Sequence, residues 1–464
     1  MLDHGRILDW DPYGYVQGRW LNIYWLFQCV VALLYRAGGF ELLVVMKSLL
    51  AASAMLAFGL ALRRRVGPAW LTFCGLAALM LMAWRIRVRP EAFTLAFLML
   101  VVVLTDGVRL GGSPRRLWWL VPVMAAWVNM HGLYVVGLAA MWTALAGAWL
   151  DRFRGRPSNL CGLSALVPAL AATAACLLSP WPIDANMHFT MLFTRIADQG
   201  HYNPASAECQ PIWQAMDVFP DAIAIALFTL FFMVMNRRRL PVGHVLWFVA
   251  FTILAAMAVR NIALLGPICG WLLAINGWPV VEKLVGLRRL WGRLAPFVLP
   301  LLVLAALGAI AVSITGMHDF GGAYRFGVGL DRDEYPLRSA RYLRDLNEPG
   351  DVFCMDFGDS APILYYAAHG LDRANRRLWI DSRLEAYSDE HFATYRRIVD
   401  ALADAKQAQT VELPPDVRFI FAGQRGKSQL AAMKQVSRFK FILDEPAGTL
   451  FERTDWPGRP LPPG

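Results

Sequence analysis

Apolar runs follow one another through the first two thirds of the chain, separated by short polar connections that are often rich in arginine. A helix that crosses the hydrocarbon core of a bilayer needs about 20 mostly apolar residues. Several of the runs are shorter than this, which a bundle tolerates where irregular backbone is buried or lines a cavity. The pattern predicts about ten spans, at residues 40–62, 69–84, 91–106, 117–130, 134–150, 163–180, 222–236, 244–259, 262–276 and 296–315.

The composition agrees with a polytopic membrane protein. Of 464 residues, 57% are hydrophobic and only 17% are charged, against about 25% charged residues in ordinary soluble domains. A water-soluble globule would have no way to bury that much apolar surface. The seven cysteines are scattered without a CxxC spacing and behave as small hydrophobic residues.

Clusters of arginine set the expected orientation. If residues 40–62 run inward, the alternation of spans places every cluster on the cytoplasmic side, as the positive-inside rule requires. We therefore expect a multi-pass membrane protein with these loops on the cytoplasmic side. The net charge of +10 comes largely from these loops and does not indicate a nucleic-acid partner. The clusters are Arg63–Arg65, Arg115-Arg116, Arg152/Arg154/Arg156, Arg237–Arg239 and Arg288-Arg289/Arg293.

The first 39 residues are expected to lie on the outer face as an acidic loop followed by an interfacial helix. Residues 20–37 are apolar enough to span, but Asn22, Gln28 and Arg36 favour an amphipathic helix in the membrane interface. The transmembrane bundle is then expected over residues 40–315.

The last part of the chain, residues 316–464, changes character. Strand-like segments at 351–357, 376–381, 417–423 and 439–443 alternate with helical patterns at 336–346, 361–369, 389–404 and 427–436. Such alternation is typical of a small α/β domain, which follows the last span and should be extracytoplasmic. Residues 448–454 are expected to close its sheet as an antiparallel edge strand.

Polar side chains collect on the predicted outer face. Polar groups at membrane depth are costly and usually functional. Arginines at this boundary can bind a phosphate or pyrophosphate with paired hydrogen bonds. A nearby carboxylate could serve as general base, with His131 as a second base, proton shuttle or phosphate ligand. The candidates are Asp9, Asp11, Arg85, Arg87, Arg89, Asn129, His131, Glu208, Arg260 and Asn261.

Each of these residues also has a structural interpretation. The boundary arginines can extend towards lipid phosphates without a catalytic role. Asn129 and His131 can cap a tight helical hairpin, and Arg260-Asn261 can form a polar turn between helices. Asp9 and Asp11 can be turn residues before Pro12.

A second group of candidates lies in the C-terminal domain. Asp381, Arg383, Glu385 and Tyr387 follow a predicted strand, a common place for a ligand site in α/β sheets. They could bind an acceptor sugar or protein, or form a salt-bridged turn. The domain has no Gly-rich phosphate loop and no metal-ligand motif, and the sequence leaves a divalent metal requirement open.

The order of these motifs resembles the GT-C membrane glycosyltransferases, in particular a bacterial branch related to the aminoarabinose and protein O-mannosyl transferases. The resemblance extends over nearly the whole chain, and its weight lies in the order and spacing of short motifs. The motifs are His4–Tyr15 with Gly18–Asn22 and Trp25-Leu26, Arg89–Phe93, Trp127/Asn129/His131/Gly132/Gly137, Glu208–Pro211, Arg260-Asn261, Tyr335-Pro336 and Asp381–Tyr387.

The resemblance implies transfer of a sugar from a polyprenyl-phosphate donor to an envelope glycan, lipid or protein on the extracytoplasmic side. It implies that an acidic residue of the first outer loop activates the acceptor and that basic residues hold the lipid phosphate. In the family, a further transmembrane helix and an acidic stretch precede the segment matched to His4–Tyr15. We therefore expect either that such a segment lies upstream, or that Asp9 or Asp11 replaces its acid, or that the protein is not catalytic.

Two other functions are compatible with the residues alone. A non-catalytic scaffold or assembly factor for envelope glycan would retain the fold without the acidic stretch. Transport is the third hypothesis, but the chain has no convincing internal repeat and its polar residues lie mostly at one face. Lys47, inside a span, and Asp106, at a cytoplasmic end, are the exceptions.

Overall fold

The computed structural model describes residues 5, 7, 10–11, 13–15, 21–184, 187, 207–214, 216, 219–285, 335–346, 348–367, 376–381, 383, 386–423 and 426–458. The chain forms two compact units. One contains Ile23–Ala311, and the other combines Asp3–Asn22 with Val312–Gly464. The N-terminal segment, which we expected to precede the bundle as a loop, therefore belongs to the same unit as the C-terminal domain.

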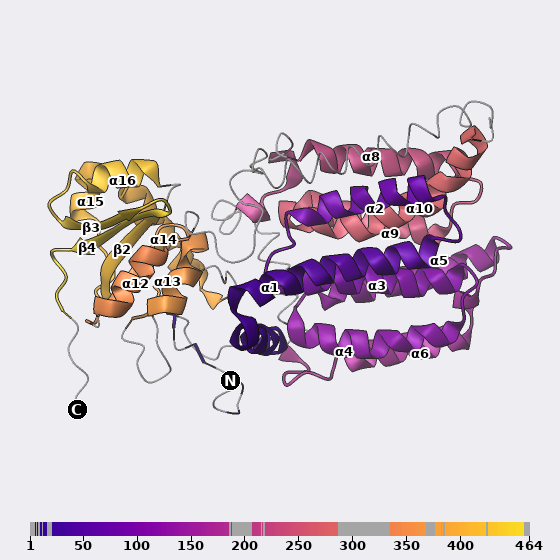
Figure 1. Cartoon of the computed structure of the whole chain (residues 1–464), viewed down its shortest axis with the longest axis horizontal. Coiled ribbons are helices and arrows are strands. Elements are labelled where there is room, and N and C mark those ends of the chain that lie inside the picture. Colours follow the sequence, from indigo (N-terminus) through magenta and orange to yellow (C-terminus); the bar gives the residue numbers. More distant parts are fainter. Residues whose placement is uncertain are drawn as a thin grey trace. The chain divides into compact units, whose positions relative to one another are not determined.

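The first unit is a helical bundle (Figure 1). Its helices are α1 (Trp25–Leu62), α2 (Pro68–Ala83), α3 (Pro90–Arg109), α4 (Leu120–Met130), α5 (Tyr134–Phe153), α6 (Leu163–Ala175), α8 (Pro220–Met235), α9 (Val242–Met257) and α10 (Ile262–Val285). Short 3-10 turns join them: η1 (Pro114–Trp119), η2 (Asn159–Cys161), η3 (Ala207–Cys209), η4 (Ile212–Gln214) and η5 (Val259–Asn261).

Nine of the ten predicted apolar runs coincide with these helices, and the tenth, 296–315, lies outside the described residues. Among the described residues, four segments are long and apolar enough to cross a membrane: Trp25–Leu62, Pro90–Arg109, Tyr134–Phe153 and Val259–Lys283. Four shorter apolar helices, α2, α6, α8 and α9, pack among them. The number of spans stays a prediction.

Helix α1 is broken at Gly38-Gly39, which separates the expected interfacial segment from the expected first span. Gly39 has φ of 63°, a left-handed conformation that favours glycine because it has no Cβ. Figure 1 shows the part before the break, in the darkest indigo, turned sharply away from the long part that packs on α3. The sequence places the break where two glycines remove helix propensity.

Small residues allow the bundle helices to approach closely. A Cβ on Gly147 of α5 would lie 2.2 Å from the backbone nitrogen of Gly243 at the start of α9. Such small-residue contacts are how helices associate where lipid provides no hydrophobic driving force. Large aromatic side chains, among them Trp127, Trp247 and Trp271, fill the remaining interior.

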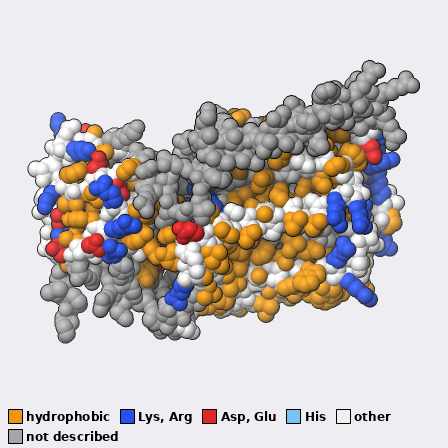
Figure 2. All heavy atoms as spheres, in the orientation of Figure 1, with side chains coloured by type: hydrophobic (Ala, Val, Ile, Leu, Met, Phe, Trp, Pro, Cys, Tyr) orange, Lys and Arg blue, Asp and Glu red, His pale blue; other side chains and the backbone are white. Residues whose placement is uncertain are grey.

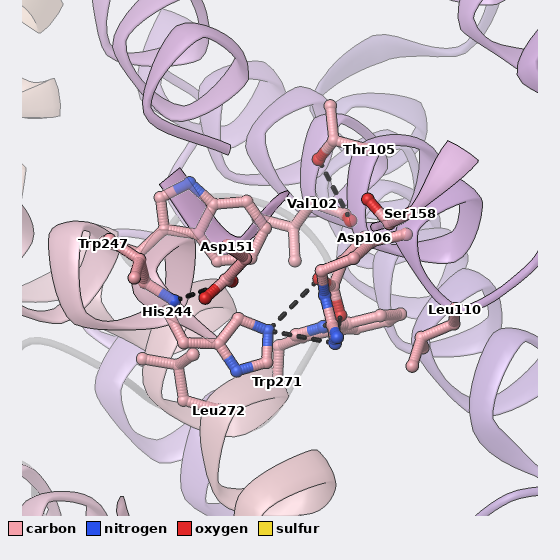
Figure 3. A network of polar contacts seen from close by, with 12 residues as sticks. Val102, Thr105, Asp106, Leu110, Asp151, Ser158, His244, Trp247, Trp271 and Leu272 are labelled. Carbon is pink, nitrogen blue, oxygen red and sulfur yellow. Dashed lines mark hydrogen bonds and ion pairs between the residues drawn. The ribbon is translucent and has the colours of Figure 1, made fainter. Parts of the chain in front are cut away.

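A buried polar network joins α3, α9 and α10 at the end of the bundle where α3 stops (Figure 3). Asp106 accepts hydrogen bonds from Trp271 Nε1 at 2.7 Å and from His244 Nε2 at 3.1 Å, and it is paired with Arg109. Asn276 Nδ2 lies 3.0 Å from His244 Nδ1, so His244 accepts at Nδ1 and carries its proton at Nε2. Asp106, the polar residue expected at a cytoplasmic end, is thus bound to Trp271, His244 and Arg109.

The surface of the bundle agrees with a membrane protein. Figure 2 shows hydrophobic side chains covering the described part of its face, with lysine and arginine side chains gathered at the end where α3 and α5 stop. The exposed arginines of residues 63–65, 115–116 and 152–156 belong to that end.

The second unit has a four-stranded sheet of order β1-β2-β4-β3. The strands are β1 (Asp351–Cys354), β2 (Val417–Gly423), β3 (Phe439–Glu445) and β4 (Gly448–Arg453). Strands β1 and β2 are parallel, and β4 is antiparallel to both β2 and β3. The helices are α12 (Leu337–Leu346), α13 (Ser360–Ala367), α14 (Asp389–Ala401), α15 (Ala405–Thr410) and α16 (Lys427–Met433), with the 3-10 turn η6 (Phe357–Asp359).

The mixed sheet confirms the small α/β domain, with two corrections. The segment 448–454 is antiparallel as predicted but is not an edge strand, because the β3–β4 hairpin pairs with β2 through β4. The segment 376–381 forms only bridges at Leu378 rather than a full strand. Leu378 bridges both Val352 and Gly14, and its N–H donates to Tyr13 O at 2.8 Å, so the N-terminal segment continues this side of the sheet.

Candidate functional site

Arg85, in the connection between α2 and α3, is the centre of a buried charge cluster. Its side chain is 4% exposed and lies between two carboxylates. NH1 donates to Glu208 Oε2 at 2.6 Å, and NH2 donates to Glu91 Oε1 at 2.7 Å. Arg89, 39% exposed, adds a longer contact of 3.5 Å to the other oxygen of Glu208. The cluster joins the start of α3 to the distant turn η3.

The local sequence explains how α3 begins here. Arg89 precedes Pro90 and has extended backbone angles, φ of −137° and ψ of 159°, because a residue before proline is disfavoured in the helical region. Pro90 occupies the first helical position, where its missing N–H costs nothing. Glu91 follows in the first turn, where the helix dipole favours a negative charge.

Glu208 is held in its ionised form by this arrangement. Burial alone would raise the pKa of Glu208, but Arg85 and Arg89 outweigh it and lower that pKa below its usual value. One third of the side chain remains exposed. The backbone near Glu208 is tied to η5, because Val259 N donates to Gln210 O at 2.8 Å. Glu208 is therefore a fixed, accessible carboxylate.

His131 lies beside the same cluster, in the turn between α4 and α5. Its Nδ1 is 2.7 Å from Thr94 Oγ1, which also accepts a hydrogen bond from Trp127 Nε1 at 2.9 Å. Burial lowers the pKa of His131 to about 4; Glu91 opposes the shift, and Arg260 and Arg85 add to it. The imidazole is therefore neutral at neutral pH.

Arg260 of η5 completes the group, because it is close enough to His131 for its charge to act on the imidazole. It is partly exposed. Lys47 of α1 is close enough to Arg87 for their positive charges to repel each other. Cations from three separate parts of the sequence thus accompany the two carboxylates at this end of the bundle.

The two asparagines predicted with these residues have structural hydrogen bonds. Asn129 Oδ1 accepts from Trp25 Nε1 at 2.9 Å, and its Nδ2 donates to Ala125 O and Leu178 O. Asn129 therefore links α1 and α4 to the residues after α6. Asn261 Nδ2 donates to Leu254 O at 2.9 Å and closes the end of α9. Both amides therefore hold the segments between helices in place through hydrogen bonds.

The sequence interpretation did not single out Glu91 and Thr94. Glu91 appeared only inside the Arg89–Phe93 motif, and Thr94 was taken as part of an apolar run. The available signal was an acidic residue and a hydroxyl three positions apart at the start of an otherwise apolar helix. That spacing places both on one helical face.

The described residues of this cluster do not fit a divalent metal. The guanidinium of Arg85 lies between Glu91 and Glu208, where a cation would have to bind. Across the described residues, no group of three or more His, Cys, Asp and Glu side chains is placed to hold a metal ion.

Asp11, predicted as a catalytic acid, lies in the other unit and is bound to Arg383. Arg383 NH2 donates to Asp11 Oδ2 at 2.6 Å, and the same guanidinium forms several hydrogen bonds to Asp381. The Asp11 side chain is 2% exposed, and its Oδ1 accepts from Tyr13 N at 3.1 Å. Asp11 thus anchors the N-terminal segment to the C-terminal domain.

Tyr387 belongs to the same cluster. Burial raises its pKa, and the neighbouring Asp381 adds to the effect, so the phenol stays protonated. Its ring stacks on His391, which in turn stacks on Trp379 with ring centres 3.9 Å apart. The predicted residues Asp9 and Glu385 lie outside the described residues.

No protein-family model and no curated protein matches this chain. The archaeal oligosaccharyltransferase AglB from Archaeoglobus fulgidus, solved with an inhibitory peptide and a dolichol-phosphate, aligns with a TM-score of 0.55. The alignment has 12% identity and covers 98% of this chain and 69% of that chain.

Two further structures of the Archaeoglobus fulgidus oligosaccharyltransferase give the same result. The complex with Zn and sulfate has a TM-score of 0.52 and 11% identity over 98% of this chain and 68% of that chain. The apo form has a TM-score of 0.52 and 11% identity over 98% and 69%. At such identity the likeness establishes the fold. The chain, with its helical bundle and C-terminal mixed sheet, therefore shares the fold of this oligosaccharyltransferase.

Proposed function

We propose that this protein is a GT-C glycosyltransferase that transfers a sugar from a polyprenyl-phosphate donor to an acceptor of the cell envelope. The observation that carries the proposal is the buried cluster around Arg85, where cations and an accessible carboxylate gather at one end of a GT-C bundle. The oligosaccharyltransferase of like fold has been solved with dolichol-phosphate, and the proposed donor has the same phosphate chemistry.

The cations have different roles in this proposal. Arg85 is buried and bound to both Glu91 and Glu208, so in this proposal it positions those carboxylates. Arg87, Arg89 and Arg260 are partly exposed and would bind the donor phosphate, since guanidinium groups form paired hydrogen bonds to phosphate oxygens. Lys47, close to Arg87, would reach the phosphate from α1. Phosphate between these like charges would relieve their repulsion.

Glu208 is the proposed general base. In the transfer, the acceptor hydroxyl oxygen bonds to the anomeric carbon while the bond from that carbon to the phosphate oxygen breaks. The polyprenyl phosphate leaves with the bonding electrons, and the hydroxyl proton passes to the base. Glu208 is ionised and one third exposed, whereas His131 is almost buried and would act as a second acceptor or phosphate ligand.

The orientation proposed from the arginine loops puts this cluster on the extracytoplasmic side of a bacterial inner membrane. The C-terminal unit would lie on the same side, where Arg383 would contact the acceptor while the buried Asp381 and Tyr387 hold it in place. Because Asp11 is bound to Arg383, its proposed role becomes support of that unit rather than direct catalysis. Asp9 keeps its proposed role as an acid of the outer loop.

The test is an assay of membranes that contain the full-length protein, with radiolabelled sugars on polyprenyl phosphate and native envelope extract as acceptor. Transfer to the extract, lost in Glu208→Gln membranes, is the expected result. As a matched control, Arg116→Gln changes an exposed arginine at the opposite end of the bundle and should leave transfer unchanged. Equal sugar transfer in wild-type and Glu208→Gln membranes would show that Glu208 is not the general base.

A non-catalytic scaffold for envelope glycan is the second candidate. Its supporting observation is that Arg85, Glu91 and Glu208 satisfy one another, as a purely structural cluster would. The two candidates differ in donor turnover. A protein that binds polyprenyl-phosphate sugar but releases no polyprenyl phosphate, even with acceptor extract present, is the outcome that favours the scaffold.

A further inference from the structure

A pocket opens at the arginine-rich end of the bundle, far along α3 and α5 from the Arg85 cluster. Its volume is about 690 Å³, within the usual range for a small-molecule site. It lies where α5 ends, η2 turns and α6 begins, with Pro114 of η1 on its rim. Arg152, Ser158, Asn159, Gly162 and Ser164 supply its polar lining.

The charge around this pocket is positive. The segments 111–119 and 152–164 contain five arginines and no acidic residue. The two acidic residues that precede these segments in the sequence already have partners. Asp106 is paired with Arg109, and Asp151 binds the backbone nitrogen of Val242 at 2.9 Å and Arg154 at 3.8 Å. Arg152 lies over the ring of Trp149 at 5.7 Å, a cation–π contact that leaves its N–H donors available.

Large apolar side chains are exposed beside these polar groups. Phe153 next to Arg152 is 83% exposed, and Leu163 next to Gly162 is 75% exposed. Trp118, Trp119 and Trp149 are also exposed on the same elements. Aromatic side chains collect where a bilayer meets water. The pocket is therefore placed to receive a molecule with an anionic head and apolar chains.

We propose that this pocket binds one anionic phospholipid, with the phosphate against Arg152 and the hydroxyls of Ser158 and Ser164. The acyl chains would lie along Phe153 and Leu163. Basic pockets between helices on the cytoplasmic side of a membrane are a recurrent type of lipid head-group site. The proposal uses no residue of the Arg85 cluster, so it stands independently of the proposed transferase activity.

Native mass spectrometry of the full-length protein tests the proposal. The protein is reconstituted in nanodiscs of equal parts phosphatidylcholine and phosphatidylglycerol and released with the lipid that it retains. The expected result is one retained phosphatidylglycerol. Arg152→Gln should lower this retention about fivefold, the effect of one arginine near an anionic surface. Ser164→Trp should lower it as well, because the indole fills the pocket without removing a charge.

Arg64→Gln is the matched control, since Arg64 is an exposed arginine of the same end that does not line the pocket. It should retain phosphatidylglycerol as the wild type does. If Arg64→Gln and Arg152→Gln lose phosphatidylglycerol equally, the lipid is attracted by the overall positive charge of this end, and the proposed site is overturned. Equal retention of the two lipids would also overturn it. Complete displacement of phosphatidylglycerol by inorganic phosphate would show a free-anion site and overturn the lipid assignment.

Discussion

Arg85 and Glu208 form an ion pair of 2.6 Å across 123 positions of sequence. The pair ties the α2–α3 connection to η3, and the second nitrogen of the same guanidinium holds Glu91 at the start of α3. A buried arginine between two carboxylates fixes the geometry of three segments at once. The residues around it, Arg89 and His131, are thereby held beside an accessible carboxylate.

Removing Arg85 should destabilise the bundle. Arg85→Gln leaves Glu91 and Glu208 facing each other without the charge between them, and breaking a buried pair in this way costs about 3–5 kcal/mol. Thermal unfolding of the protein in detergent measures the loss. The double variant Arg85→Gln/Glu208→Gln should regain part of it, because one of the two facing charges is gone. Unchanged unfolding of the single variant would contradict the structural role.

Arg89 should matter for activity more than for folding. It is 39% exposed, and its contact with Glu208 is long, so Arg89→Gln should leave the unfolding temperature near that of the wild type. If Arg89 binds the donor phosphate, kcat/KM should fall about tenfold or more, as expected for loss of a charged hydrogen bond of about 1.5–3 kcal/mol. Lysine at this position should restore part of the rate. A normal kcat/KM for Arg89→Gln is the contrary result.

His131 should make stability depend on pH between about 4 and 6.5. The folded pKa of about 4 lies below the ordinary value of 6.5, so in this window the unfolded chain takes up a proton and the folded protein does not. Stability is therefore complete above pH 6.5 and falls as the pH drops towards 4, by about 3 kcal/mol in total. Unfolding temperatures measured across this range in detergent report the slope.

The matched variant for this measurement is His131→Asn. The pKa of His391 is also lowered by burial, so it contributes a slope of the same sign in both proteins. Glu208, whose pKa is lowered, adds to the loss of stability only below its usual value of 4.5. The difference between wild type and His131→Asn from pH 6.5 to 4.5 therefore isolates His131. If the unfolding temperatures of the two proteins change in parallel over that range, His131 is not the source of the pH dependence.

Asp106 should be a major support of the bundle although it lies far from the proposed site. Asp106→Asn removes the charge that Arg109, His244 and Trp271 share, and the cost should be about 3 kcal/mol. Trp271→Phe keeps the charge and removes one donor, so it should cost about 1.5–3 kcal/mol. Detergent unfolding of the two variants compares these effects. A larger loss of stability in Trp271→Phe than in Asp106→Asn would contradict this prediction.

Asp11 and Arg383 should be energetically coupled. Their 2.6 Å contact joins the N-terminal segment to the C-terminal domain. Asp11→Asn and Arg383→Gln should each speed proteolysis within the first 22 residues, and the double variant should be no worse than Arg383→Gln alone. Additive effects of the two substitutions would mean that the contact contributes nothing.

Much of the fold could be predicted because membrane helices follow local rules. Runs of apolar residues locate α2, α3, α5 and α9 to within a few residues, since a helix satisfies its backbone hydrogen bonds within the segment. Pairing in the C-terminal sheet was less predictable. The position of β4 between β2 and β3 depends on long-range contacts that alternation alone does not specify.

The candidate site was predicted in part. Arg85, His131, Glu208 and Arg260 were expected on one face, and the structure brings them together, but their roles depend on partners that a linear pattern does not reveal. Asn129 illustrates this, because a costly polar residue in an apolar run proves to be a hydrogen-bond link to Trp25 and Leu178. Glu91 was overlooked because one acidic residue at a helix start is also ordinary capping.

The sequence by itself determined that this is a membrane protein with an α/β tail, because hydropathy and the arginine loops act locally along the chain. Only the tertiary structure decided which charges meet. Arg85 pairs with Glu91 and Glu208, and Asp11 pairs with Arg383, because ion pairs depend on distance in space. In a poorly solvated interior a charge must find a partner within a few ångströms, and folding brings that partner from over a hundred residues away.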